Sequence, residues 1–306
     1  METSYLNLIA DVLENGEVRT DRTGTGTISL FGKQIRCDLA KGFPLLTSKK
    51  VAFTPVVGEL LWFLEGGSDE RRLAEITYGT QDSTQKTIWS GNAGADYWTP
   101  KSRFDGDLGR VYGVQWRHWT HTSLKESSDS ISHEGGGTTY FGAKVLVEEH
   151  DQIAKIIHTL KTNPTDRRMV LTAFNVGEMD QMALPPCHMF AQFYVSRGKY
   201  LSCQVYIRSN DLFLGLPFNI ASYALLVHMI VQVTGLEVGE LIITIGDAHI
   251  YSNHIDQVKQ QLSNSIFEPP TLWLNPEIKS IDDFKMEDII LNNYHSHGAI
   301  KAPMAV

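Results

Sequence analysis

The sequence predicts one α/β (α+β) domain built around a mixed β-sheet that helices cover. Helix-like and strand-like patterns alternate along its 306 residues, with no internal repeat and no Rossmann fingerprint. Residues 220–233 are apolar on nearly every side, which predicts a helix buried in the core. A chain of this length can bury one large core, so we expect a single domain over residues 1–306.

The amino-acid composition indicates which kinds of binding partner and which cellular compartment to expect for this protein. The net charge is -8 and the pI is near 5.8, which leaves no basic face for DNA or an anionic membrane. Cys37, Cys187 and Cys203 are too few and too scattered for a disulfide framework or a metal site. The N-terminus lacks the segments of a signal peptide, and the most apolar stretch is shorter than the roughly 20 residues that cross a bilayer. We therefore expect a cytoplasmic protein without metal and without a membrane span.

The first segments predict a helix and a strand pair. Apolar residues recur at helical spacing within the first 13 positions, and Gly16 follows as a stop signal. Residues 27–39 are typical of two strands around Gly32. The preceding run RTDRTGTGT carries Arg22 among small residues whose N–H groups can approach an anion, although alone it is more typical of an ordinary turn.

Three charged residues stand out in the next segments. Lys49 and Lys50 end the run GFPLLTSKK, and such a pair is typical of a solvated edge unless the anionic tail of a ligand lies above it. Residues 56–64 predict an apolar helix in which Glu59 is the one acid. Burying an ionised acid there is costly, so Glu59 must be paired, shifted in pKa or exposed.

The middle of the chain predicts loops, an insertion and paired arginines. Residues 66–110 are polar and weakly periodic, and residues 120–139 hold so few apolar side chains that we expect a surface insertion. A helix over 153–160 precedes Arg167 and Arg168. Paired arginines are usually a solvated face, but they can also grip a phosphate.

The last third predicts strands of the sheet and a mobile end. Residues 201–207 alternate apolar and polar side chains, and strand signals return over 241–245. These strands flank the apolar helix expected in the core. The final segment IKAPMAV has no charged side chain after Lys301 and could fold onto the body like a lid.

The stretch MALPPCHMFAQFYV contains the candidate nucleophile, Cys187. Pro185 and Pro186 fix the backbone in front of it, so the thiol can be aimed. A neighbouring cation such as His188 or an arginine could lower the thiol pKa and favour the reactive thiolate. A free cysteine is as often a small packing residue, and this motif alone leaves both interpretations open.

The polar residues form groups that suit one kind of substrate. Cys187 could attack an electrophilic carbon, Glu59 could move a proton, and arginines could hold a phosphate. The amide of Asn219 both donates and accepts, which suits the uracil edge with its carbonyl beside an N–H. Together these residues predict that the substrate is a phosphorylated small molecule that a sulfur nucleophile attacks. The other polar residues in this group are Arg22, Arg167, Arg168, Arg208, His249 and Tyr251.

The chain resembles the thymidylate synthase family over nearly its whole length. The matching segments are long and ordered, and a chance match of all of them is not credible. The resemblance implies a homodimer formed through the sheet. The segments are DRTGTGT (21–27), ELLWFL (59–64), GDLGRVYGVQWRHW (106–119), DRR (166–168), MALPPCH (182–188), RSND (208–211), LGLPFNIASYA (214–224) and GDAHIYSNH (246–254).

The resemblance implies transfer of the one-carbon unit of 5,10-methylenetetrahydrofolate to C5 of dUMP. Cys187 would add to C6 of the base, and Glu59 would move protons through ordered water. Tyr112 and His188 would support that network, and Asn219 would read the pyrimidine. Implied phosphate and sugar contacts are Arg22, Arg208, Ser209, His249 and Tyr251, joined by Arg167 and Arg168 of the second subunit.

The folate co-substrate has its own implied contacts. Asp211 would serve both catalysis and folate binding, and Lys49 would lie near the glutamate tail. Closure of the C-terminal segment would exclude water before hydride transfer. The implied folate residues are Lys49, Trp89, Asp211, Leu214, Gly215, Phe218, Ala305 and Val306.

Departures from the family pattern keep the product open. Ile207 replaces a Gln, Ser90 an Asp and Arg110 an apolar residue. Phage relatives, which work in the host cytoplasm, deliver water instead of hydride and make hydroxymethyl nucleotides. We expect reductive methylation to dTMP because the terminal closing segment is intact, with 5-hydroxymethyl-dUMP as the alternative. Cys187, Glu59 and Asn219 argue against a non-catalytic nucleotide-binding protein, and Asn219 also argues against dCMP.

Overall fold

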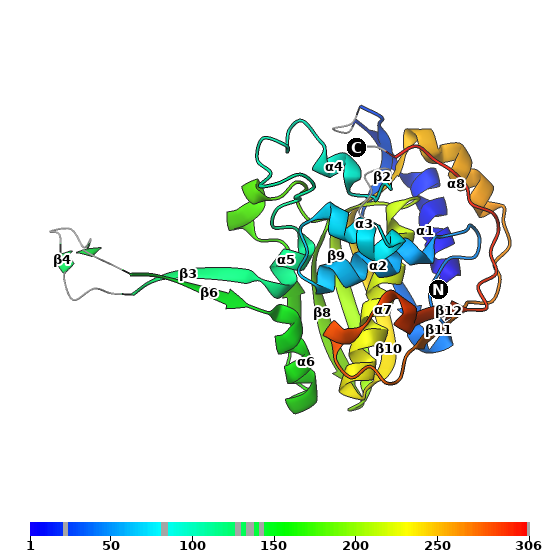
Figure 1. Cartoon of the computed structure of the whole chain (residues 1–306). Coiled ribbons are helices and arrows are strands. Elements are labelled where there is room, and N and C mark those ends of the chain that lie inside the picture. Colours follow the sequence, from blue (N-terminus) through cyan, green and yellow to red (C-terminus); the bar gives the residue numbers. More distant parts are fainter. Residues whose placement is uncertain (21–23, 81–84, 126–129, 133–137, 141–143, 305–306) are drawn as a thin grey trace.

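A six-stranded mixed sheet organises the fold. The computed structural model describes residues 1–20, 24–80, 85–125, 130–132, 138–140 and 144–304. The strand order is β1-β2-β10-β9-β8-β7, and helices pack against the sheet (Figure 1). The expected α/β class with a mixed, helix-covered sheet is therefore confirmed.

The helices fall close to the expected positions. Gly16 ends the first helix, and its N–H donates to Val12 O across 3.0 Å. Gly235 ends the longest helix in a left-handed conformation that favours glycine. The α-helices are α1 (Glu2–Asn15), α2 (Phe53–Leu64), α3 (Glu70–Tyr78), α4 (Ser90–Ala93), α5 (Tyr112–Arg117), α6 (Gln152–Thr162), α7 (Gly215–Thr234) and α8 (Ile255–Leu262). The short 3-10 turns are Leu39–Lys41, Val176–Gln181, Ser252–His254, Ile281–Asp283 and Met286–Asp288.

The strands build the sheet and three small ribbons. Strands β9 and β10 are parallel, and α7 supplies the crossover that a parallel pair needs. The other neighbours in the sheet are antiparallel. The strands are β1 (Glu17–Arg19), β2 (Thr27–Asp38), β3 (Trp119–Lys125), β4 (Ser130–Ser132), β5 (Thr138–Tyr140), β6 (Lys144–His150), β7 (Val170–Thr172), β8 (His188–Ser196), β9 (Tyr200–Asp211), β10 (Glu237–Tyr251), β11 (Thr271–Leu274) and β12 (Ile289–Asn292).

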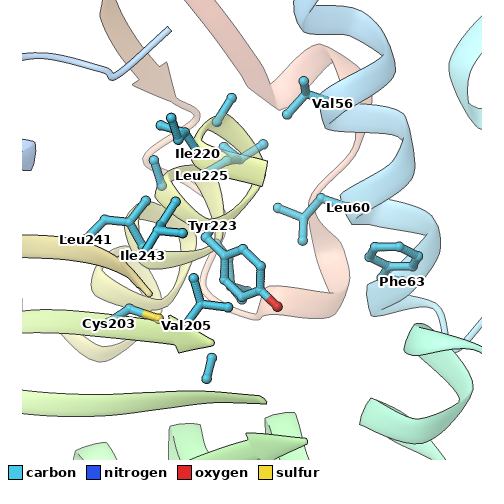
Figure 2. Packing of buried hydrophobic residues seen from close by; sticks show 14 of the residues in the cluster. Val56, Leu60, Phe63, Cys203, Val205, Ile220, Tyr223, Leu225, Leu241 and Ile243 are labelled. Carbon is cyan, nitrogen blue, oxygen red and sulfur yellow. The ribbon is translucent and has the colours of Figure 1, made fainter. Parts of the chain in front are cut away.

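The core lies between the parallel strands, α7 and α2. Cys203 and Val205 of β9 and Ile243 of β10 face the apolar side chains of α7, and Leu60 of α2 covers α7 from the other side (Figure 2). All four side chains are fully buried. Cys203 is therefore a packing residue, which is one of the two roles that a free cysteine commonly has. By length and composition α7 could cross a bilayer, but 67% of its most apolar window is buried inside this fold.

Two expectations about the N-terminal segments were wrong. Residues 27–38 form one continuous strand rather than a pair, because Gly32, with φ of 76°, does not turn the chain back, and Leu39 begins a 3-10 turn. Both halves pair with β10, through Phe31↔Asp247 and Lys33↔Ile245. Lys49 does not lie on a solvated edge: it is 5% exposed, whereas Lys50 is exposed.

A ribbon projects from the body where an insertion was expected. Strands β3 and β6 pair from Trp119↔His150 to Lys125↔Lys144 and extend away from the domain (Figure 1). Val145 and Val147 are each 61% exposed on it. The ribbon reaches to His150, so the protruding element is longer than the predicted 120–139.

Candidate active site

A pocket of about 210 Å³ opens beside Cys187. Its walls come from α2, α3, α4 and the segment before it, α5, the cysteine motif and the first turns of α7. The structure therefore brings together residues as far apart in the sequence as Pro55 and Asn219. The predicted site residues that line it are Glu59, Trp89, Tyr112, Cys187, His188, Leu214, Gly215, Phe218 and Asn219.

Hydrogen bonds on both sides fix the backbone of Cys187. Its N–H donates to Tyr112 Oη across 2.7 Å, and its carbonyl accepts from the N–H of Arg208 across 2.8 Å. The Arg208 guanidinium in turn donates to the carbonyls of Pro185 and Pro186, each across 2.9 Å. The proline pair and these bonds hold the thiol at the pocket wall, as the rigid approach predicted.

The electrostatics of Cys187 differ from the expectation in two ways. Burial raises the thiol pKa, and the nearby Arg208, whose Nη2 lies 3.8 Å from Sγ, opposes that rise without cancelling it. His188 cannot be the activating cation, because burial lowers its pKa to about 3 and keeps it neutral. Arg208 is therefore the group beside Sγ that would stabilise a thiolate.

Tyr112 and His188 form a stacked pair behind the thiol. Their ring centroids are 4.0 Å apart and the planes are inclined by 18°. His188 Nδ1 lies 2.8 Å from Tyr223 Oη of α7. Burial raises the pKa of both tyrosines well above the usual value, so the phenols are neutral. Sequence reasoning missed Tyr223, although a tyrosine in an otherwise apolar core helix signals a hydroxyl that needs a partner.

Glu59 projects from α2 into the pocket and is not on an exposed face. Burial raises its pKa to about 7, while a hydrogen bond from Trp89 Nε1 to Glu59 Oε1, 2.7 Å long, opposes the rise. A carboxyl with a pKa near neutrality populates both the acid and the base form. Of the three possibilities that the sequence allowed for Glu59, pairing, a shifted pKa or exposure, the structure shows the shifted pKa.

A carboxylate from α3 holds the segment that carries Trp89. The Trp89 N–H donates to Thr87 Oγ1 across 3.1 Å, and that hydroxyl donates to Glu70 Oε1 across 2.7 Å. Ser90 Oγ also donates to Glu70 Oε1, across 2.5 Å. The departure at Ser90 is thus accommodated because Glu70 supplies the acid.

The entrance to α7 positions Asn219 and the apolar wall. Asp211 Oδ1 accepts from the N–H groups of Phe213 and Leu214, across 2.8 and 3.1 Å, and so stabilises the turn into the helix. Asn219 lies on the pocket side of α7, and its Oδ1 accepts from Asn210 Nδ2 across 3.2 Å. Sequence reasoning gave Asn210 no role.

The expected phosphate and sugar residues lie outside this pocket wall. Ser209 of β9 pairs with Asp247 of β10. His249 Nδ1 lies 3.3 Å from Asp247 Oδ1, and the register places Tyr251 opposite Thr27, at the end of the RTDRTGTGT run. Arg22 lies outside the described residues.

Arg167 and Arg168 are not brought to the pocket of their own chain. The Arg168 side chain is 89% exposed and pairs with Asp166 across 3.0 Å. The backbone carbonyl of Arg167 accepts from Gln192 Nε2. A site that includes these arginines would have to take them from a second chain, which stays a prediction.

A comparison with known families agrees with the fold and the pocket. A family model for thymidylate synthase matches residues 3–306. The chain belongs to the thymidylate synthase family. This family transfers one-carbon units to dUMP and uses methylenetetrahydrofolate as co-substrate, which confirms the expectation of a one-carbon transferase.

Within this family context, Lys49 lies apart from the other predicted folate residues that line the pocket. Trp89, Leu214 and Phe218 give the pocket an apolar wall that fits a flat ring system. Lys49 instead faces the loop before α7, where its ammonium donates to the carbonyl of Phe213 and lies 3.5 Å from the ring centroid. Burial lowers the pKa of Lys49 to about 7. A role of Lys49 at the glutamate tail stays a prediction.

A buried histidine attaches the C-terminal segment to the body. His254 is fully buried, and its Nε2 lies 2.7 Å from the carbonyl of Pro303. His254 Nδ1 lies 3.9 Å from Asp211 Oδ1, so this histidine links the terminal segment to the turn before α7. Ala305 and Val306 lie outside the described residues.

The two other family departures also have local explanations. Ile207 is fully buried in the sheet, where a hydrocarbon needs no hydrogen-bond partner. Arg110 pairs with Glu178 across 2.6 Å and donates to the carbonyl of His118 across 2.7 Å, and Thr120 also donates to Glu178. Arg110 therefore anchors the base of the β3–β6 ribbon. In the part of the chain that is described, no cluster of three His, Cys, Asp or Glu could hold a metal.

Proposed function

We propose that the protein converts dUMP to dTMP and that 5,10-methylenetetrahydrofolate serves as both carbon donor and reductant. The observation that carries this proposal is the meeting of Cys187, Glu59 and Asn219 in one pocket. The sulfur supplies a nucleophile, the carboxyl moves protons and the amide reads a pyrimidine edge. The apolar side chains beside them suit a flat aromatic ring such as a pterin.

The residues divide the chemistry between them. Cys187 Sγ would add to C6 of the pyrimidine, and C5 would attack the methylene carbon as the bond from that carbon to a folate nitrogen breaks. Loss of the C5 proton and of the remaining C–N bond, followed by hydride transfer and departure of Sγ from C6, would then give the methylated product. Glu59, with a pKa of about 7, takes and returns protons at this step. Arg208 stabilises Cys187 as a thiolate before addition and again when the C–S bond breaks. Folate binding supplies the one-carbon unit and the hydride.

Attachment of the C-terminal segment supports methylation over hydroxymethylation. The Pro303 carbonyl lies 2.7 Å from His254 Nε2, and His254 Nδ1 lies 3.9 Å from Asp211 of the turn that leads into α7. A closed segment excludes water, and water is the reagent that would otherwise give 5-hydroxymethyl-dUMP. Cytoplasmic localisation is part of the same proposal.

A homodimer that forms through the sheet is also proposed. On the face of the sheet away from α7, Phe190 stacks on Tyr206 with centroids 5.8 Å apart, and Tyr194 is 62% exposed. Large aromatic side chains on an uncovered sheet face are typical of an interface core. A second chain on this face would bury them and could bring its Arg167 and Arg168 to the first chain's substrate.

Product analysis tests the proposed reaction. The protein is incubated with dUMP and methylenetetrahydrofolate, and the nucleotide and folate products are identified by mass. We expect dTMP and dihydrofolate. Hydroxymethyl-dUMP with tetrahydrofolate would reject reductive methylation. Binding of dUMP without a covalent adduct to 5-fluoro-dUMP and folate would reject an enzyme of this type, and Cys187→Ala serves as the negative control.

A further inference from the structure

A buried amide lies directly behind the side chain that reads the base. Asn210, near the end of β9, is 3% exposed, and its Nδ2 donates to Asn219 Oδ1 across 3.2 Å. Asn219 lines the Cys187 pocket, whereas Asn210 is not among the described residues that line it. Asn210 therefore acts on a ligand in this pocket through Asn219 rather than by direct contact.

The oxygen of the Asn210 amide faces the start of α7. A Cβ atom added at Gly215 would lie 3.3 Å from Asn210 Oδ1, so this oxygen faces the first residue of the helix. The first N–H groups of a helix lack intrahelical partners and carry its positive end. They favour an oxygen over an NH₂ group at this position. The Asn210 NH₂ group is therefore directed at Asn219.

With the Asn210 amide in this orientation, Asn219 can offer a ligand one lone pair of Oδ1 and the N–H groups of Nδ2. Its Oδ1 has two lone pairs, and Asn210 occupies one of them. The other lone pair can accept from an N–H, and Nδ2 can donate to a carbonyl. Uracil presents N3–H and O4 side by side and matches this pair. Cytosine presents an acceptor at N3 and an amino group at C4, and so needs the amide reversed.

We infer that Asn210 is a specificity-determining positioning residue that holds Asn219 in the uracil-reading orientation. The inference rests on the proposed function, since it assigns a uracil nucleotide to the same pocket. If Asn219 reversed to read cytosine, its NH₂ group would face the NH₂ group of Asn210 and both would lose a buried partner. The contact between Asn210 and Asn219 thus disfavours cytosine binding as well as favouring uracil binding.

The test compares binding of dUMP and dCMP to three variants. Asn210→Asp offers only acceptors and should draw the Nδ2 group of Asn219 toward itself, which reverses the amide. Asn210→Ser offers a hydroxyl that can donate or accept and fixes neither orientation. Asn163→Asp makes the same chemical change at the exposed end of α6. Dissociation constants for both nucleotides and kcat/KM for dUMP are measured on the intact protein.

We expect the preference for dUMP over dCMP to fall at least tenfold in Asn210→Asp, about threefold or more in Asn210→Ser and not at all in Asn163→Asp. If Asn210 had a purely structural role, its replacement would weaken the binding of dUMP and dCMP equally. An unchanged ratio of the two dissociation constants would therefore overturn the inference. If Asn210→Asp does not fold, the serine variant decides. Absence of the 5-fluoro-dUMP adduct in the wild type would reject the proposed function itself. With that adduct present, only the nucleotide ratio bears on Asn210.

Discussion

Trp89 Nε1 donates to Glu59 Oε1 across 2.7 Å and so joins the residue before α4 to the middle of α2. Burial raises the pKa of Glu59 to about 7, and this bond opposes the rise because it stabilises the carboxylate. The working pKa is therefore a balance between desolvation and one indole N–H.

Trp89→Phe should move the pH dependence of catalysis upward. Without the indole N–H the Glu59 pKa rises further, so the rising limb of kcat against pH should shift by roughly 0.5–1 unit to higher pH. A pH series of kcat at saturating substrates measures the shift. Trp98→Phe is the matched control, because Trp98 is also buried but donates to the Asp107 carbonyl. Equal shifts in the two variants would disprove the assignment.

Glu59→Gln should lose activity and gain stability above neutral pH. The folded-state pKa of Glu59 lies above its unfolded value of about 4.5, so its contribution to stability is lost as pH rises from about 4.5 to about 7. At pH 8 the amide avoids the cost of a buried carboxylate and should raise the free energy of unfolding by roughly 1–3 kcal/mol. Urea denaturation at pH 5 and pH 8 measures this, and a gain of the same size at both values would contradict the explanation.

The sequence predicted the elements with strong patterns and the members of the pocket, but not their electrostatic states. The helices ending at Gly16 and near Val233 and the alternating strand over 201–207 formed because their apolar spacing matches one face of the core. Lys49 and His188 were misjudged because burial depends on distant segments. Lys49 is covered by the loop at Phe213, and His188 lies between Tyr112 and Tyr223.

Local patterns also fail where a side chain acts through tertiary neighbours. Gly32 was interpreted as a turn because the sequence does not show that β10 pairs with both sides of it. Ser90 and Arg110 differ from the residues usual in the family, yet each has an acidic partner from another segment. Ser90 donates to Glu70, and Arg110 pairs with Glu178. Asn210 carried no signal, because its contact with Asn219 exists only once β9 and α7 are packed together.

Arg110→Leu should destabilise the fold through the acid that it leaves behind. The Arg110 and Glu178 side chains are only 20% and 15% exposed, and removing the cation leaves the Glu178 carboxylate buried without its charge partner. The expected loss is about 2 kcal/mol in the free energy of unfolding, measured with urea. Arg36→Leu is the control, because its pair with Glu240 is exposed and should contribute below about 0.5 kcal/mol. Equal losses would show that burial of the pair is not the cause.

Mixing two inactive variants tests whether one site needs two chains. Cys187→Ala removes the nucleophile, and Arg168→Glu removes an arginine that lies away from the pocket of its own chain. If arginines are shared across the dimer, a mixed dimer has one site with Cys187 from one chain and Arg168 from the other. Its second site lacks both groups.

Random reassociation makes half of the dimers mixed, so activity should return to about a quarter of the wild-type value, because a twofold dimer holds two sites. The measurement is the rate of product formation after the two variants are unfolded together and refolded. Each variant refolded alone is the control and should stay inactive. No recovery from a mixture that sediments as a dimer would place Arg168 outside the site, whereas full activity of Arg168→Glu alone would remove the need for it.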